Sequence, residues 1–319
     1  MRILTDADLL HALEPVVARN LDRHLAAARD WLPHEWLPWS RGRDFAGRDC
    51  IPWAPGQSPL GGAAQAALRL NLLAEDNLPS YHHELLARMG HAGAWGAWVR
   101  RWTAEEARHA AGLRDYALLS RAIDPVALER DRMTVMQAGC SAGGKDLLRS
   151  LAYAALQELA TRVAHRNTGL AANDPAAEHL MARIAADENL HMLFYRDLMA
   201  EALAMAPAQG LIAIVDEVIG FKMPGVGIPG FMQATVLMAD AGIYDLKLHR
   251  DEVLQPLLKH WHALSLPAAG EAAENAQRQL VRHLERLDLM AHRQEQRRHR
   301  RQQAWEEARP GPSPTGSSP

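Results

Sequence analysis

Apolar residues recur at every third or fourth position through most of this chain, which is the spacing of helices that bury one face. In the first such stretch these residues are Leu9, Leu10, Leu13, Val16 and Val17. Thr5 and Asp8 precede it with the spacing of a capping box, so a helix is predicted to begin there. The alternation of apolar and polar residues that is typical of strands is sparse. The pattern therefore predicts an all-α fold.

Segments rich in proline and glycine separate the predicted helices. Beyond the first helix, we expect helices at residues 63–86, 94–120, from 124 onward, 146–165, 175–205, 251–264 and 271–291. Residues 31–62 hold five prolines and are predicted to form an irregular strap, whereas 138–144 and 223–230 are predicted loops. Pro79 lacks the amide hydrogen that would bond to the carbonyl of residue 75, so a local helix break is expected at Glu75.

Two of the predicted helices carry a glutamate and a histidine three residues apart, which places both side chains on one helix face. Another helical glutamate precedes each pair at a similar interval, 31 residues in the first case and 30 in the second. This doubled arrangement is the ligand pattern of a di-iron carboxylate helix bundle. The six candidate metal ligands are Glu75, Glu106, His109, Glu158, Glu188 and His191.

The donor types indicate which metal such a site would hold. Carboxylates are hard, anionic ligands that can bridge two metals, and a single histidine per metal leaves coordination positions open. Iron or manganese suits this mixed set better than zinc in a closed site. Cys50 and Cys140 are the only cysteines and cannot build an iron–sulfur cluster, so electrons must come from outside the chain.

Three further residues are predicted to support the metal ligands. Asp187 and Glu105 directly precede the motif glutamates, and the near-repeat suggests that they cross over. Asp187 would then accept the second ring N–H of His109, and Glu105 that of His191, unless these carboxylates face solvent. Thr161 lies one turn after Glu158, so its hydroxyl either reaches the metal pocket as a proton relay or bonds back to its own helix.

Composition restricts the alternatives further. The chain has 319 residues, 48% of them hydrophobic, which is enough for a substantial core. A formal net charge of -3 does not suggest a nucleic-acid partner. Because no signal region and no apolar stretch of roughly 20 residues is found, no membrane span is predicted and a cytoplasmic location is expected.

Five segments, in this order along the chain, resemble the soluble acyl-acyl-carrier-protein (acyl-ACP) desaturases. They are Trp31-Leu-Pro-His-Glu-Trp-Leu-Pro38, Glu75-Asp-Asn-Leu-Pro-Ser-Tyr81, Trp102-Thr-Ala-Glu-Glu-Ala-Arg-His109, Glu158-Leu-Ala-Thr161 with His165-Arg-Asn-Thr168, and Ala186-Asp-Glu-Asn-Leu-His191. The resemblance covers most of residues 1–265.

The resemblance implies a ferritin-like di-iron four-helix bundle with additional flanking helices, assembled as a homodimer. It implies that an acyl chain carried on acyl carrier protein reacts with dioxygen and with electrons from ferredoxin to give a cis double bond. In the family's arrangement, Glu75 and His109 would bind one iron ion and Glu158 and His191 the other, with Glu106 and Glu188 bridging. Thr161 and Asp187 match the family's pocket threonine and supporting aspartate, and Trp31 matches a tryptophan near the first iron.

The domain division follows from the same patterns. Residues 1–291 are predicted to form one ferritin-like domain, and residues 292–319, which are basic and then rich in Pro, Ser and Gly, to form a frayed helix end and a disordered tail. Five arginines in this tail either attract an acidic partner or belong to a solvated helix end; they are Arg293, Arg297, Arg298, Arg300 and Arg301.

Several other functions share parts of this pattern. A ribonucleotide reductase radical subunit needs a tyrosine about one turn beyond the first motif histidine, and here that residue is Leu113. A ferritin-type iron store would be shorter and would lack the Trp- and Pro-rich strap. A related di-iron acyl hydroxylase or oxygenase, and a non-catalytic iron-binding helical protein, remain alternatives. The sequence does not specify the length of the acyl chain or the position of the double bond.

Overall fold

The computed structural model describes residues 3–139, 144–267 and 270–307. Within these ranges the chain is helical and contains no strand, which confirms the all-α prediction. The α-helices are α1 (Asp6–Ala27), α2 (Gly62–Glu75), α3 (Leu78–Met89), α4 (Gly93–Leu119), α5 (Pro125–Ala138), α6 (Leu147–Ala172), α7 (Pro175–Met205), α8 (Pro207–Gly220), α9 (Phe231–Asp240), α10 (Leu246–Leu248), α11 (Gln255–His260) and α12 (Glu271–Glu307). A π-helical turn, His249–Leu254, joins α10 to α11.

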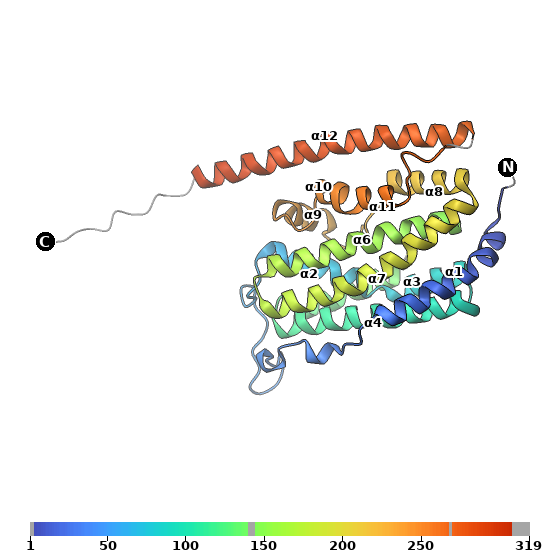
Figure 1. Cartoon of the computed structure of the whole chain (residues 1–319). Helices are drawn as coiled ribbons and strands as arrows, with labels where there is room; N and C mark the ends of the chain where they lie inside the picture. The colour runs from blue at the N-terminus through green and yellow to red at the C-terminus, as the bar shows by residue number, and fades with distance from the viewer. Residues whose placement is uncertain (1–2, 140–143, 268–269, 308–319) are drawn as a thin grey trace.

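Four helices, α2, α4, α6 and α7, form the centre of the molecule (Figure 1). The most extensive helix packing is between α6 and α7, and α2 packs on both α4 and α6. Five of the remaining helices pack around this centre: α1 lies on α4 and α7, α3 on α4, α9 on α2, and α8 on α6 with α12 outside it. The predicted four-helix core with flanking helices is therefore confirmed.

Helices α6 and α7 pack closely near the turn that connects them. Gly169 faces α7 so closely that a Cβ atom there would lie 2.8 Å from the Cβ of Met181. Asp174 then caps α7 by accepting a hydrogen bond from the backbone N–H of Ala176 at 3.1 Å. The same buried carboxylate accepts the Tyr116 hydroxyl at 2.8 Å, and Arg41 Nη1 lies 2.9 and 3.0 Å from its two oxygens. This contact ties the strap to the end of the bundle.

The two predicted irregularities near the centre are present. Residues 28–61 form a strap with only two short 3-10 turns, Pro33–Glu35 and Trp39–Arg41, and it is anchored by the buried side chains of Trp31, Leu37 and Leu60. The helix break is found at Asp76 and Asn77, because α2 ends at Glu75 and α3 begins at Leu78 with a proline in its first turn. The capping box of Thr5 and Asp8 is also confirmed.

The C-terminal region differs from the expectation. Helix α12 continues without interruption to Glu307, through part of the segment predicted to be a frayed helix end and a disordered tail. Two arginines beyond residue 292 bond to acidic residues at the end of α9 and before α10: Arg301 to Asp240 at 2.8 Å, and Arg298 to Asp245 at 3.2 Å. Figure 1 shows that α12 extends past the rest of the bundle. Residues 308–319 lie outside the described residues.

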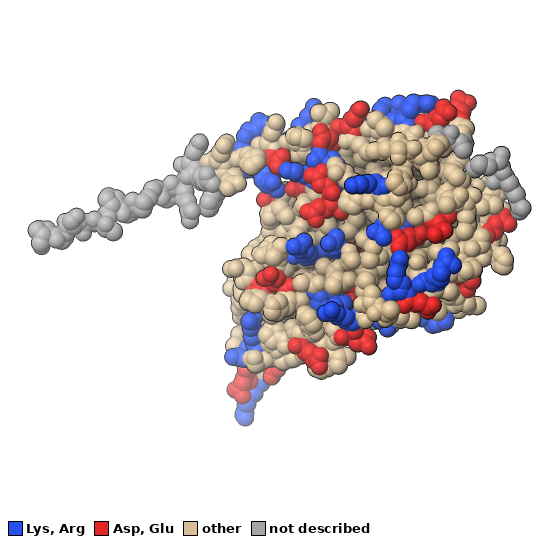
Figure 2. Space-filling view, in the orientation of Figure 1, with Lys and Arg blue, Asp and Glu red and all other residues tan. Residues whose placement is uncertain are grey.

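Basic and acidic side chains are mixed over the visible surface. On the face drawn in Figure 2, lysine and arginine side chains lie among aspartates and glutamates, including along α12. None of the helices in the described ranges has an apolar stretch long enough to cross a membrane.

Candidate metal centre

The four central helices bring all six predicted ligands together. Helix α2 supplies Glu75, α4 supplies Glu106 and His109, α6 supplies Glu158, and α7 supplies Glu188 and His191. Each side chain is buried, with at most 8% of its residue surface exposed. Their donor atoms form two overlapping groups, each within 4.8 Å, and both groups contain Glu106 and Glu188. The first group adds Glu75 and His109, and the second adds Glu158 and His191.

Both imidazoles point one nitrogen into this cluster. His109 Nδ1 lies 3.2 Å from Glu106 Oε2 and 3.2 Å from Glu188 Oε1. His191 Nδ1 lies 2.9 Å from Glu106 Oε1 and 3.5 Å from Glu158 Oε2. In both rings Nδ1 is therefore the atom available to a metal.

The other ring nitrogen meets the carboxylate that sequence symmetry predicts. His109 Nε2 lies 3.4 Å from Asp187 Oδ2, and His191 Nε2 lies 3.0 Å from Glu105 Oε2. These crossed contacts confirm the predicted pairing and exclude the solvent-facing alternative, because both carboxylates are buried. A carboxylate acceptor keeps the hydrogen on Nε2 and leaves the Nδ1 lone pair free for a cation.

Several supporting residues were missed by spacing arguments. Trp102 donates its indole N–H to Glu158 Oε1 at 3.0 Å, and His165 Nε2 lies 2.8 Å from Glu75 Oε1. Both residues stand in the motifs of the resemblance, but no local spacing indicates which carboxylate they reach. His24 lies at the end of α1 with Nε2 2.9 Å from Glu105 Oε2, and no motif pointed to it.

Thr161 combines the two arrangements that the sequence left open. Its hydroxyl oxygen lies 2.6 Å from Glu188 Oε2, and also 3.1 Å from the backbone oxygens of Gln157 and Glu158. The bond to Glu188 places this hydroxyl at the edge of the cluster. The predicted proximity to the metal pocket is therefore confirmed, whereas proton transfer stays a prediction.

The electrostatics of the cluster suit a cation. Burial and the neighbouring Glu188 carboxylate hold the pKa of Glu158 well above its usual value. Burial alone would lower the pKa of His109, but the carboxylate of Glu106 and its other acidic neighbours raise it well above the ordinary value. Burial opposes ionisation of Asp187, yet hydrogen bonding to His109 lowers its pKa to about 2. The negative charge is thus only partly compensated by the imidazoles.

The hydrogen bonding of the buried donor atoms also suits a bound cation. Four buried atoms of the cluster lie close to one another or to His109 Nδ1 but make no well-aligned hydrogen bond in the described part of the chain: Glu106 Oε1, Glu158 Oε2, Glu188 Oε1 and His191 Nδ1. Buried polar atoms without partners are costly, so a group of them converging on one point requires an explanation. A metal ion bound by these atoms would satisfy them together.

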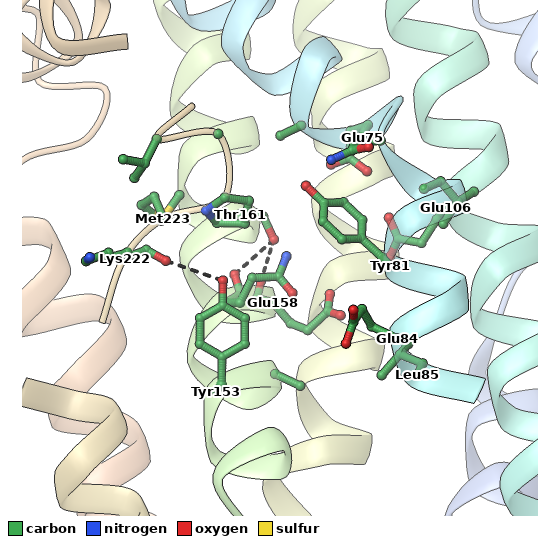
Figure 3. Close-up of a pocket in the computed structure, with 18 of the residues that line it drawn as sticks. Glu75, Tyr81, Glu84, Leu85, Glu106, Tyr153, Glu158, Thr161, Lys222 and Met223 are labelled. Carbon is green, nitrogen blue, oxygen red and sulfur yellow. Dashed lines mark hydrogen bonds between the residues drawn. The ribbon is translucent and has the colours of Figure 1, made fainter. Parts of the chain in front are cut away.

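A cavity of about 670 Å³ leads to the cluster (Figure 3). Its inner end is formed by Glu75, Glu106 and Glu158, with Thr161 beside them. Its apolar lining comes from α2, α3, α6 and the 223–228 segment, and includes Leu73, Leu78, Leu85, Ala154, Met223 and Ile228. A smaller, adjoining cavity of about 90 Å³ also touches Glu75 and Thr161. The cluster is therefore open to a largely apolar ligand.

The fold and this site define a class: helical-bundle proteins with a buried carboxylate–histidine cluster that can hold a metal. Residues 5–309 match the family model described as fatty acid desaturase, and the chain belongs to this family. It is 48% identical over 266 residues to a Mycobacterium tuberculosis protein named acyl-ACP desaturase DesA1, covering 81% of this chain and 79% of that protein.

Two comparisons involve a second mycobacterial protein. The chain is 33% identical over 272 residues to the protein named acyl-ACP desaturase DesA2, covering 84% of this chain and 94% of the relative. The X-ray structure of DesA2 from Mycobacterium tuberculosis H37Rv matches with a TM-score of 0.70 and 28% identity, over 84% of this chain and 98% of that one. The recognised family resemblance is therefore confirmed.

Proposed function

We propose that this protein is an oxygen-dependent di-iron acyl-ACP desaturase, which introduces a cis double bond into an acyl chain carried on acyl carrier protein. The observation that carries the proposal is the pair of overlapping carboxylate–histidine groups at one end of a largely apolar cavity of about 670 Å³. The names of the relatives support the carrier-bound substrate. A homodimer is proposed from the family resemblance.

The residues present fit two iron ions. Glu75 and His109 would hold one ion, Glu158 and His191 the other, and Glu106 and Glu188, which belong to both groups, would bridge them. When bound, the ions supply the reduction of dioxygen and the oxidising power that removes two hydrogen atoms from the chain. Such iron sites use oxygen and nitrogen donors and leave some coordination positions open.

Electron balance requires an external donor. Forming a double bond releases two electrons and two protons from the acyl chain, whereas reduction of dioxygen to two water molecules takes four of each. Two electrons and two protons must therefore be supplied for every double bond. Cys50 and Cys140 cannot build an iron–sulfur cluster, so the supply comes from outside the chain, and the family resemblance implies a reduced ferredoxin as the donor.

The chain's own residues position the reaction. Asp187 and Glu105 fix the tautomer and direction of the two imidazoles. The apolar lining of the cavity holds the acyl chain beside the cluster and excludes water from it. The Thr161 hydroxyl, bonded to Glu188 at 2.6 Å, is placed to pass protons to the reacting centre.

The test has two parts. Apoprotein is first reconstituted with Fe²⁺ without oxygen, and bound iron is counted; two ions per chain are expected, and less than one would exclude a di-iron enzyme. The Glu84→Gln variant, altered in the cavity but outside the cluster, should bind the same amount. Carrier-bound acyl chains of graded length are then supplied with reduced ferredoxin and oxygen, and products are identified by mass spectrometry.

The products distinguish the alternatives. Loss of two hydrogens from one chain-length class is expected. Gain of one oxygen would instead identify an acyl hydroxylase, and bound iron without turnover on any carrier substrate would identify a non-catalytic iron-binding protein.

A further inference from the structure

The supporting residues on the two sides of the cluster form matching arrangements. On one side, Trp31 stacks on His109, with ring centroids 6.4 Å apart and planes 17° apart. Its indole N–H donates to Asp187 Oδ2 at 2.7 Å, the oxygen that faces His109 Nε2. On the other side, His24 stacks on His191 at 5.7 Å and 21°.

His24 also repeats the hydrogen bond. Its Nε2 lies 2.9 Å from Glu105 Oε2, the oxygen that lies 3.0 Å from His191 Nε2. Because one carboxylate oxygen accepts from both rings, each Nε2 carries a hydrogen. The second oxygen of this carboxylate, Glu105 Oε1, lies 2.5 Å from Arg101 Nη2. His24 therefore holds, relative to His191, the place that Trp31 holds relative to His109.

Packing alone does not explain a histidine here. His24 is only 3% exposed, with Trp98 edge-on at 5.1 Å, and its Nδ1 has no hydrogen-bond partner among the described residues. A buried polar atom without a partner destabilises the fold, and a phenylalanine or leucine would avoid this cost. The feature that an apolar residue cannot supply is the N–H directed at Glu105.

We propose that His24 is a positioning residue for the metal ion bound by Glu158 and His191. It holds Glu105, which in turn fixes the ring direction of His191 so that Nδ1 faces Glu106 and Glu158. This inference rests on the proposed di-iron site, but it concerns only one of its two halves. The halves are thus supported by different donors, an indole from the strap and an imidazole from α1.

Two variants separate hydrogen bonding from packing. His24→Phe keeps a stacked ring and removes the donor, whereas His24→Gln keeps an N–H donor near the position of Nε2. Apoprotein is titrated with Co²⁺, and binding is followed by the visible absorption of the bound ion. We expect the wild-type chain to bind two Co²⁺ ions. In His24→Phe one ion should bind about 10–100-fold more weakly with an altered absorption band, the other should be unchanged, and His24→Gln should restore binding.

Two controls identify the affected half. In a His191→Ala background, which removes the second site, His24→Phe should not change the affinity of the remaining ion. Trp31→Phe should weaken the other ion instead. Thermal unfolding of each metal-free variant reports the structural cost separately from metal binding.

The outcomes are distinct. If wild-type protein binds two ions and His24→Phe leaves both unchanged, or weakens both equally without rescue by His24→Gln, the inference is overturned. If wild-type protein binds less than one Co²⁺ ion, the proposed metal centre itself fails, whatever the variants do.

Discussion

Replacing Glu158 with glutamine is expected to stabilise the metal-free protein and to weaken its binding of metal. The side chain is buried beside two other carboxylates, and burial together with Glu188 holds its pKa well above the usual value. Glutamine has the same shape and can still accept the Trp102 indole N–H, now 3.0 Å from Glu158 Oε1. The substitution therefore removes charge while keeping the packing.

The size of the effect follows from the neighbouring charges. The donor atoms of Glu106, Glu158, Glu188 and His191 lie within 4.8 Å of one another. At an effective dielectric constant of about 20, unit charges about 4–5 Å apart interact by about 3–4 kcal/mol. Two repulsions and one attraction leave about one repulsion uncompensated, and proton uptake relieves part of it. We expect Glu158→Gln to raise the free energy of unfolding by about 1–3 kcal/mol near pH 8.

The pH dependence gives a second measure. Because the pKa of Glu158 is higher in the folded than in the unfolded protein, the cost of its charge is present above the folded pKa and is lost as pH falls through it. The advantage of the variant should therefore grow from acidic to alkaline pH.

Urea unfolding of chelator-treated protein, at a series of pH values, measures this difference. Glu84→Gln is the matched control, since Glu84 lines the same cavity outside the cluster, and it should change stability by less than about 0.5 kcal/mol. Equal or lower stability of metal-free Glu158→Gln at alkaline pH would refute the electrostatic reasoning.

Two further predictions concern a hydroxyl and a cap. Thr161→Val removes the hydroxyl bonded to Glu188 and should lower the single-turnover rate by about 100-fold or more at matched iron content. Thr161→Ser should retain most of the rate. Equal rates for Thr161→Val and the wild-type protein would exclude a proton-transfer role. Asp174→Ala removes a helix cap and leaves the buried Tyr116 hydroxyl unpaired, so denaturant unfolding should show a loss of about 2–4 kcal/mol. Arg41→Ala removes only the half-exposed partner of Asp174 and should cost about 0.2–1 kcal/mol; equal losses for the two variants would contradict this account.

Features set by local geometry could be predicted from the sequence. A spacing of three residues in a regular helix puts Glu106 and His109 on one face whatever surrounds them. The break after Glu75 follows from the missing amide of Pro79. The crossed contact of Glu105 with His191 was predictable because the motif occurs twice, so that one half indicates the arrangement of the other.

Contacts between distant segments could not be predicted in this way. His24 meets Glu105 across 81 positions, and neither residue has a local spacing that indicates the other. The continuation of α12 to Glu307 is similar, since Arg298 and Arg301 pair with acidic residues more than 50 positions earlier, which composition alone does not reveal. Helix α8 was also not anticipated; it is stabilised by packing between α6 and α12.

The position of Glu75 at the end of α2 links metal binding to the stability of this helix. Glu75 is the last residue of its helix, whereas the other five proposed ligands lie within helices. The carboxyl end of a helix carries partial negative charge, which disfavours a nearby carboxylate and favours a cation. The carboxyl group of Glu75 therefore lies next to the partial negative charge of its own helix end, at the break between α2 and α3. A bound cation reverses the sign of this interaction and strengthens the terminal turn of α2 at the wall of the cavity.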